Sequence, residues 1–467
     1  MTTAVKDYGI GSRPHVVVTI ILFVMLASLD NAAIMILPSI LLTVSEDLNV
    51  ATSLLGWVTA SVLLVTALTA VAWGYWGDRS NRKWLLIAGT LEWSLGSWFT
   101  AQAITLPQLW AAQAFAAIGL GAIASIGFST ISDFVAPSRR GLAMSFWGLS
   151  QGAGSLFGGL YASQVGATDW RRPFISIAAL GALAGCAYVI AYEPIRGRSE
   201  PELAGAVYDF RIERSDLPAI AAIRSNRWLI AQGVTAQLAY GALIWVPLLY
   251  QSKVQAEGYD IATSTQVGGI FAALFQVAAI ASIGAGYLGD RWQSKNLRGR
   301  ALLSMIGILG AIPFFLGFFF VPLQNLAITP GASTMANIYD ILTSIIQNPW
   351  VGAAFGLSVC AAILTSADSP NWFALIADVN LPEHRGTVFG AANLANGIGR
   401  SAGNALTGLT AASLLTWFAA PLNYAIGLAV FQLFFIPTGY AYWKVSRTAE
   451  VDIMRVTKLL RARSRQS

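Results

Sequence analysis

Long apolar segments, separated by short polar stretches, run through almost the whole chain. Each is long enough for a membrane-spanning helix, which needs roughly 20 predominantly apolar residues. We place twelve of them at residues 16–44, 54–76, 84–105, 108–132, 142–165, 173–192, 228–250, 266–288, 301–322, 350–377, 387–416 and 421–443. The pattern predicts an all-α, multi-pass integral membrane protein with twelve spans.

Basic residues are concentrated in every second polar stretch between the apolar segments. Lys6 and Arg13 precede the first span, which has no small-residue cleavage site and is expected to be retained. All but four of the 29 Lys and Arg residues then fall in the tails and in every second loop; the exceptions are Arg171, Arg172, Lys253 and Arg400. Such an excess of positive charge marks the cytoplasmic side. Both termini are therefore predicted to be cytoplasmic, in a protein of the cell membrane.

The longest polar interruption divides the chain into two halves of six spans. We predict an N-terminal bundle at 1–192, a cytoplasmic linker at 193–227, a C-terminal bundle at 228–443 and a basic tail at 444–467. The tail alternates apolar and basic residues, which fits an amphipathic helix on the inner leaflet or a disordered segment. Residues 323–349 are predicted to form a long outer loop.

Two separate motifs recur, one copy in each half. Gly-Tyr-Trp-Gly-Asp-Arg at 74–79 returns as Gly-Tyr-Leu-Gly-Asp-Arg at 286–291, 212 positions later. Asp133-x-x-x-Pro137-x-x-Arg140-Gly141 returns as Asp378-x-x-x-Pro382-x-x-Arg385-Gly386, 245 positions later, and the same offset carries Gly152, Gly154 and Gly158 onto Gly397, Gly399 and Gly403. The repeat predicts two pseudo-symmetric six-helix bundles, the arrangement of a transporter with a midplane site and alternating access.

Composition agrees with this and excludes several other functions. The chain is 55% hydrophobic and 11% charged, with a mean hydropathy of +0.60. Two cysteines in apolar segments (Cys186 and Cys360) and two histidines (His15 and His384) predict no disulfide framework and no metal site. The net charge of +6 does not indicate nucleic-acid binding, because the basic residues gather on one face. A phosphate-binding Gly-x-x-x-x-Gly-Lys-[Ser/Thr] motif is also absent from the sequence, and no cofactor is predicted.

The turn at Gly74–Lys83 and its surroundings resemble the major facilitator superfamily, over nearly the whole chain. In the N-terminal half, Leu29-Asp30 followed by Leu37-Pro38, then Trp57-Val58-Thr59-Ala60, is similar to the drug:proton antiporter type. The acidic residue in the first span and the turn at Asp133 are also similar to Spinster-type lysolipid transporters. The resemblance implies a secondary transporter of a small organic or amphipathic solute, with protons as a candidate coupling ion and membrane lipid as its surroundings. We expect a monomer.

Three positions depart from these two types. Gln113 occupies the place of the antiporters' fourth-span arginine, and Ser155 that of their fifth-span proline. Ala122 stands where the Spinster type has a glutamate. The branch therefore stays open, and so do uptake of an organic anion and a non-transporting sensor on the same fold. An enzyme acting on lipid is disfavoured, because the sequence offers no nucleophile and base at membrane depth.

The repeated turns are the candidate gates. Gly77 permits close approach of two helices, and Asp78 can then face a helix N-terminus. Arg79 and Arg82 are predicted to reach Asp133, and in the C-terminal half Asp290 and Arg291 are predicted to pair with Asp378. Arg140 and Arg385 complete the set of gating candidates. The alternative is a plain topology-setting turn.

Ionisable and polar residues within the spans are the candidates for a substrate or proton site, because charge in mid-membrane is costly. Asp30, Glu92 and Asp368 are the acidic candidates, and Arg400 lies at a depth from which it could meet Asp368. Pro370 is expected to break the helix after Asp368. The polar candidates are Gln113, Gln237, Tyr240, Asn371 and Asn396. Asp368 and Arg400 could instead form a structural pair, and Glu92 or Gln113 could hydrogen-bond within the bundle.

Overall fold

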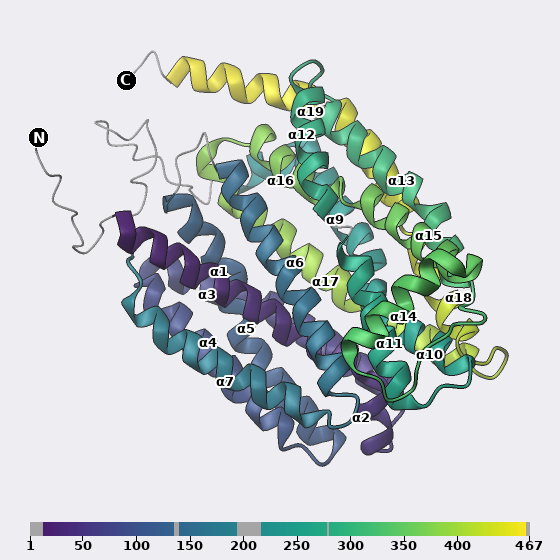
Figure 1. Cartoon of the computed structure of the whole chain (residues 1–467). Helices are drawn as coiled ribbons and strands as arrows, with labels where there is room; N and C mark the ends of the chain where they lie inside the picture. The colour runs from purple at the N-terminus through teal and green to yellow at the C-terminus, as the bar shows by residue number, and fades with distance from the viewer. Residues whose placement is uncertain (1–12, 135–139, 194–215, 278–279, 464–467) are drawn as a thin grey trace, which may run out of the picture. The chain divides into compact units, whose positions relative to one another are not determined.

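The computed structural model describes residues 13–134, 140–193, 216–277 and 280–463, and within these ranges the chain is helical, with no strand. Nine helical segments of this part are long and apolar enough to cross a membrane. The all-α membrane architecture is therefore confirmed, and the figure of twelve spans stays a prediction. Figure 1 shows the helices with their labels.

Seven α-helices form the first half. They are α1 (Arg13–Ser39), α2 (Leu41–Asp47), α3 (Thr52–Arg79), α4 (Arg82–Ala101), α5 (Leu106–Phe134), α6 (Arg140–Val165) and α7 (Arg171–Ala187), the last continued by the 3₁₀ turn η2 (Tyr188–Ile190). Asn81 begins α4 as its N-cap, its side chain accepting a hydrogen bond from the Trp84 N–H at 3.3 Å. A short turn thus separates α3 from α4 immediately after the Gly-Asp-Arg motif.

The second half has more breaks than the hydrophobic pattern predicts. Its helices are α8 (Asp216–Ala222), α9 (Arg224–Ala242), η4 (Leu243–Trp245), α10 (Val246–Ala256), α11 (Ile261–Val277), α12 (Ala281–Gln293), α13 (Gly299–Phe320), α14 (Thr334–Gln347), α15 (Pro349–Thr365), α16 (Asp368–Val379), α17 (Pro382–Leu414), α18 (Leu422–Gln432) and α19 (Phe435–Arg463). Within the described residues, three predicted spans are each divided between two helices: α9 with α10, α15 with α16, and α18 with α19. Breaks of this kind are tolerated in membranes where neighbouring groups satisfy the freed backbone.

Two sequence expectations need correction, and one open alternative is decided. The predicted outer loop at 323–349 contains the helix α14, whose exposed apolar residues Met335, Tyr339, Leu342 and Ile346 recur at helical spacing. Lys253, which lies just outside the predicted span 228–250, is a buried residue of α10. The basic tail is helical as far as Arg463, where α19 ends, which excludes the disordered alternative for that part.

The contacts of the repeated turns follow both sequence offsets. In the first half α3 meets α5 where Gly74 lies against Ser125 and Gly77 against Ile126. In the second half α12 meets α16 through Gly286 against Pro370 and Gly289 against Asn371. The glycines differ by 212 positions and their partners by 245, the same offsets that relate the two motifs. The repeat is therefore a repeat of packing as well as of sequence.

The glycines of the fifth and eleventh predicted spans repeat in the same way. On α6, Gly154 and Gly158 pack against the backbone of α1 at Ser28 and Ala32. On α17, Gly399 and Gly403 pack against the backbone of α9 at Val234 and Leu238. An added methyl group would overlap a backbone atom at each of these crossings, so the missing side chains allow the close approach.

By its internal contacts the chain forms two compact units, Met1–Leu37 with Val65–Asp209, and Pro38–Leu64 with Phe210–Ser467. In the first unit α4 packs against α5 and α7. In the second, α9 packs against α17 and α19, and α13 against α15 and α19. The segment Pro38–Leu64 belongs to the second unit although it precedes most of the first in sequence.

Candidate functional site

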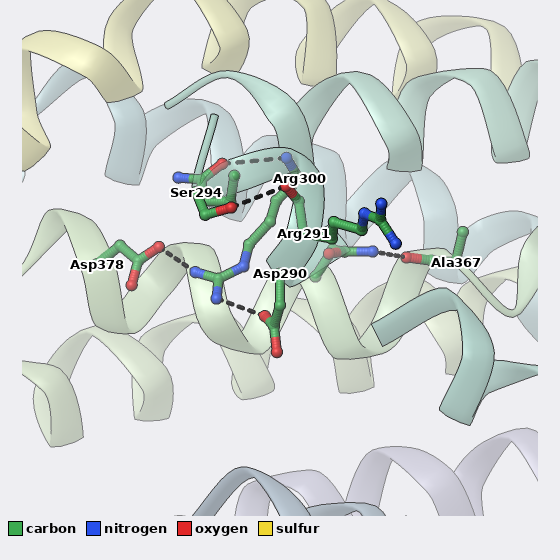
Figure 2. A network of polar contacts seen from close by, with 8 residues as sticks. Asp290, Arg291, Ser294, Arg300, Ala367 and Asp378 are labelled. Atoms are coloured by element: carbon green, nitrogen blue, oxygen red, sulfur yellow. Dashed lines mark hydrogen bonds and ion pairs between the residues drawn. The ribbon is translucent and has the colours of Figure 1, made fainter. Parts of the chain in front are cut away.

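Arg300, the second residue of α13, joins the two acidic residues of the repeated motifs in the second half. Its Nη2 donates to Asp290 Oδ1 at 2.6 Å, and its Nη1 donates to Asp378 Oδ2. Figure 2 shows the guanidinium between the two carboxylates, which come from α12 and α16. We call this arrangement the Arg300 bridge. Because one planar guanidinium binds both anions, it ties three helices together at a single point.

The sequence had assigned this role to Arg291, and that assignment is wrong. Arg291 is exposed, and Figure 2 shows its side chain directed away from Asp378. One residue along a helix turns the side chain by about 100°, so Arg291 cannot share the face of α12 that Asp290 occupies. Arg300 lies close because the turn after Gln293 is short: the Gln293 side chain accepts from the Arg300 N–H at 3.1 Å.

The first-half gate is described only in part. Gly77 is buried at the α3–α5 contact, and Arg82 is buried as the first residue of α4. The Arg82 N–H donates to Glu193 Oε1 at 2.9 Å. The side chains of Asp78, Arg79, Asp133, Arg140 and Arg385 lie outside the described part of the structure, so the predicted pairing of Arg79 and Arg82 with Asp133 stays a prediction.

Asp30 is buried in the middle of α1, with 3% of its surface exposed. It lies between Ser28 and Ala32, the two points at which α6 approaches α1 most closely. Its Oδ1 atom is buried and makes no hydrogen bond to any described residue. A buried carboxyl oxygen without a donor is costly when the group is ionised, so the surroundings of Asp30 favour its neutral form.

Glu92 and Gln113 lie on neighbouring helices of the first unit. Glu92 is partly buried on α4, where its Cβ lies against Gly119 of α5. Gln113 on α5 is buried, and its side-chain amide donates to Thr100 Oγ1 on α4 at 3.0 Å. Gln113 therefore makes the interhelical hydrogen bond that the sequence left open as an alternative.

Asp368 is the first residue of α16, directly after the break in the predicted tenth span, and its side chain is buried. Oδ1 accepts from the Tyr442 hydroxyl of α19 and from the Gln232 amide of α9, the latter at 3.2 Å. The Tyr240 hydroxyl of α9 also reaches the carboxyl group. These four residues, the Asp368 cluster, join the break between α15 and α16 to α9 and α19.

Arg400 and Asp368 form no ion pair among the described residues, so the suggested pairing is not made in this structure. Arg400 is an exposed residue of α17. Gln237 is partly buried on α9 with its Cβ against Gly399 of α17, and Asn396 Oδ1 is buried against Gly233 without a hydrogen-bond donor in the described chain. Asn371 donates to the Ala367 carbonyl at 2.8 Å, closing the break before α16.

A family model described as "Major Facilitator Superfamily" matches residues 20–358 of the chain. The chain belongs to the major facilitator superfamily. It is thus a multi-pass membrane transporter and not an enzyme, as the resemblance of its turns implied.

Known relatives place this superfamily member near one group of transporters. It is 25% identical over 376 residues to protein spinster homolog 3 of Mus musculus, covering 74% of this chain and 71% of that one. It is also 25% identical over 287 residues to the sphingosine-1-phosphate transporter SPNS2 of Xenopus tropicalis, covering 59% and 55%. The crystal structure of a bacterial homologue of the human lysosomal transporter Spinster matches with a TM-score of 0.73 at 17% identity, over 95% of this chain and 99% of that one.

Three residues of these sites were not singled out in the sequence as functional candidates: Arg300, Gln232 and Tyr442. Arg300 was visible as one of several basic residues after the second motif, but its distance from Asp290 depends on the length of a turn. Gln232 and Tyr442 lie far from Asp368 in sequence and carry no motif. A polar residue at 232, two helical turns before Tyr240 on the same face of α9, was the one available signal.

Proposed function

We propose that this transporter moves an amphipathic organic solute with an anionic head group by alternating access. The observation that carries the proposal is the Arg300 bridge. This pair of salt bridges holds α12, α13 and α16 together at the site of a duplicated motif. Contacts of this kind can be made in one state of a transport cycle and broken in another, which is how a gate biases a two-state equilibrium. With both termini cytoplasmic, this gate faces the cytoplasm.

A second contact supports a gate toward the opposite face. The ring of Trp245 fits between Gly56 and Gly408, and its Nε1 donates to Asn404 Oδ1 at 2.7 Å. Asn404 in turn donates to Thr59 Oγ1 at 2.7 Å. We call these five residues the Trp245 cluster. It fixes the first turns of α3 to helices of the second half, and we propose that it is the outer gate in its closed form.

The substrate class follows from charge and likeness together. Arg400 is exposed within the span formed by α17, where a cation is expensive unless it serves a ligand or finds a partner. Its guanidinium suits a phosphate or carboxylate head group. Two relatives named above are a spinster homologue and a sphingosine-1-phosphate transporter, which favours a single-chain lipid over a sugar. Asp30 is the proposed proton site of the first half, with Glu92 beside it as the alternative.

Flux into proteoliposomes tests the proposal. Purified protein is reconstituted, and radiolabelled sphingosine 1-phosphate is followed with and without an imposed pH gradient. We expect the wild-type protein to give more flux than protein-free vesicles. Arg400→Gln should reduce the flux at least about tenfold, which corresponds to one lost charge-assisted contact of about 1.4 kcal/mol. In Asp30→Asn the pH gradient should no longer change the flux. Lys295→Gln, which removes an exposed charge near the inner gate, is the matched control. Equal flux in protein-free vesicles would refute the substrate class, and an unchanged gradient effect in Asp30→Asn would refute the proton site.

A further inference from the structure

All four residues of the Asp368 cluster belong to the second unit of the chain, whereas Asp30 and Glu92 belong to the first. We propose that Asp368 is a second proton-binding site, in which Tyr442, Gln232 and Tyr240 hold the carboxyl group in both its neutral and its ionised form. The inference rests on the proposed function only for the use of the proton in transport. Binding of the proton is a property of the cluster itself.

The neutral form is supported by what surrounds the carboxyl group. Asp368 is buried, and among the described residues no Lys, Arg or His forms an ion pair with it. The Tyr240 hydroxyl, which reaches the carboxyl group, is itself placed to donate to the Thr365 carbonyl at 3.5 Å. Its oxygen can therefore accept a hydrogen bond from a neutral Asp368, so a continuous chain of donors leads from the carboxyl group to the end of α15.

The ionised form is supported by the opposite set of groups. The Tyr442 hydroxyl and the Gln232 amide both donate to Oδ1, and donors to a carboxylate stabilise its charge. Asp368 is also the first residue of α16, where the helix dipole favours a negative charge. A carboxyl group with hydrogen-bond partners for both forms can take up and release a proton without losing all of its own hydrogen bonds.

Other ionisable groups on the helices around α16 are engaged elsewhere or make no contact with Asp368. On α12 and α13, Asp290 and Arg300 belong to the Arg300 bridge, together with Asp378 of α16 itself. On α17, Arg400 forms no hydrogen bond or ion pair with Asp368 within the described chain. On α13, Ser304 donates to the Ala367 carbonyl at 3.3 Å. Tyr240 and Tyr442 are therefore the titratable groups that face Asp368 directly.

The place of the cluster gives the proton a mechanical consequence. Asp368 follows the two-residue break Ser366–Ala367. Its partners come from α9 and α19, which both pack against α16. Uptake forms one O–H bond on the carboxyl group, with the proton taken from water, and release returns it there. Protonation removes the negative charge to which Gln232 of α9 and Tyr442 of α19 donate. Protonation thus changes how α16 is held to α9, on the same helix that carries Asp378 of the inner gate.

Infrared difference spectroscopy of the purified full chain in lipid nanodiscs, between acidic and alkaline pH, tests the assignment without any substrate. We expect a protonated-carboxyl band that is lost on raising the pH, is absent in Asp368→Asn and is retained in Asp30→Asn. Tyr442→Phe should shift that band to higher wavenumber, because the carboxyl oxygen loses a donor.

Two outcomes would overturn the proposal: an Asp368→Asn spectrum that keeps every carboxyl band of the wild type, or Tyr442→Phe bands at unchanged positions. The second comparison stands even if Asp368→Asn fails to fold. Loss of sphingosine 1-phosphate flux with these bands intact would refute the proposed substrate and leave the proton site in place.

Discussion

Lys253 is a buried basic residue whose contacts stabilise the fold. Its side chain is 3% exposed on α10, and Nζ donates to the Phe318 and Val321 carbonyls, each at 2.7 Å. These carbonyls lie at the C-terminal end of α13, where backbone acceptors lack helical partners and the helix dipole favours a cation. The ammonium group therefore caps one helix from another.

Replacing Lys253 by methionine should destabilise the protein by about 3 kcal/mol, because two buried carbonyls lose a charged donor. Denaturant unfolding of the purified protein in detergent measures the change. Lys295→Met, which removes an exposed lysine, should leave the unfolding midpoint within error of the wild type. An unchanged midpoint for Lys253→Met would show that water or another group satisfies the end of α13.

The Arg300 bridge can be distinguished by experiment from the pairing of Arg291 with Asp378 that the motif predicts. In a double-mutant cycle, Arg300→Gln and Asp378→Asn should show a coupling energy of about 2 kcal/mol, since the two side chains are in direct contact. Arg291→Gln and Asp378→Asn should be additive within about 0.5 kcal/mol. Unfolding free energies of the wild type, the three single variants and the two double variants give both cycles. Coupling of Arg291 with Asp378 would contradict the arrangement in Figure 2.

At the scale of single residues, the acidic members of these sites could be predicted from the sequence, whereas the residues that bind them could not. Asp290, Asp378 and Asp368 stood out because each is a charge in or beside an apolar segment. Arg300 and Tyr442 did not, because their positions depend on a turn length and on the packing of helices far apart in sequence. A motif records which residues recur, whereas a side-chain contact also needs the rotation of each helix about its axis.

At the scale of helices, glycine positions decide how closely α12 and α16 approach. Gly289→Ala should destabilise the protein by about 1–3 kcal/mol, because the added methyl group overlaps Asn371. Gly284→Ala is a matched control on the same helix, since an added methyl group there meets nothing within 4 Å. That control should be neutral or stabilising by up to about 1 kcal/mol through helix propensity. Thermal unfolding compares them, and equal midpoints would mean that α16 moves aside at no cost.

The repeat predicts which contacts correspond, and the structure shows that they are not equally tight. Gly77 is the first-half counterpart of Gly289, and a methyl group there would lie 3.0 Å from Ile126 Cγ1, a flexible side chain. Gly77→Ala should therefore cost less than Gly289→Ala. The same thermal unfolding measures both, and a larger loss for Gly77→Ala would contradict this order.

The hydrophobic pattern predicted the spans well and their interruptions poorly. Length and apolar content mark a segment that can cross a membrane, but they are the same for a straight helix and a broken one. The break at Ser366–Ala367 is held by Ser304 and Asn371, both of which bond the Ala367 carbonyl. Pro370 signalled this break, whereas no proline stands between α18 and α19, where the predicted twelfth span is divided. Helix α14 was missed because its polar face resembles a loop in a hydropathy profile.

At the scale of the whole molecule, the sequence repeat and the compact units divide the chain differently. The motifs relate two halves of six predicted spans, whereas the internal contacts assign Pro38–Leu64 to the second unit. The Trp245 cluster contributes to this assignment, because Gly56 and Thr59 of α3 contact Trp245 and Asn404 of the second half. Helix α2 contributes as well, since it packs against α10 and α11. A segment that belongs to one half by sequence and to the other by contact is what a closed gate requires.

If the Trp245 cluster is such a gate, locking it should stop transport. Thr59→Cys with Asn404→Cys, in a chain whose Cys186 and Cys360 are replaced by serine, places two thiols where side chains now share a 2.7 Å hydrogen bond. Oxidation should abolish sphingosine 1-phosphate flux in proteoliposomes, and reduction should restore it. The matched control is Ser225→Cys with Thr448→Cys, which joins α9 to α19 within the second half, where the two hydroxyls lie 2.8 Å apart. Because those helices are expected to move together, cross-linking them should leave at least about half of the flux, a change in barrier of about 0.4 kcal/mol. Full flux in the oxidised Thr59–Asn404 variant would show that this contact stays closed throughout the cycle.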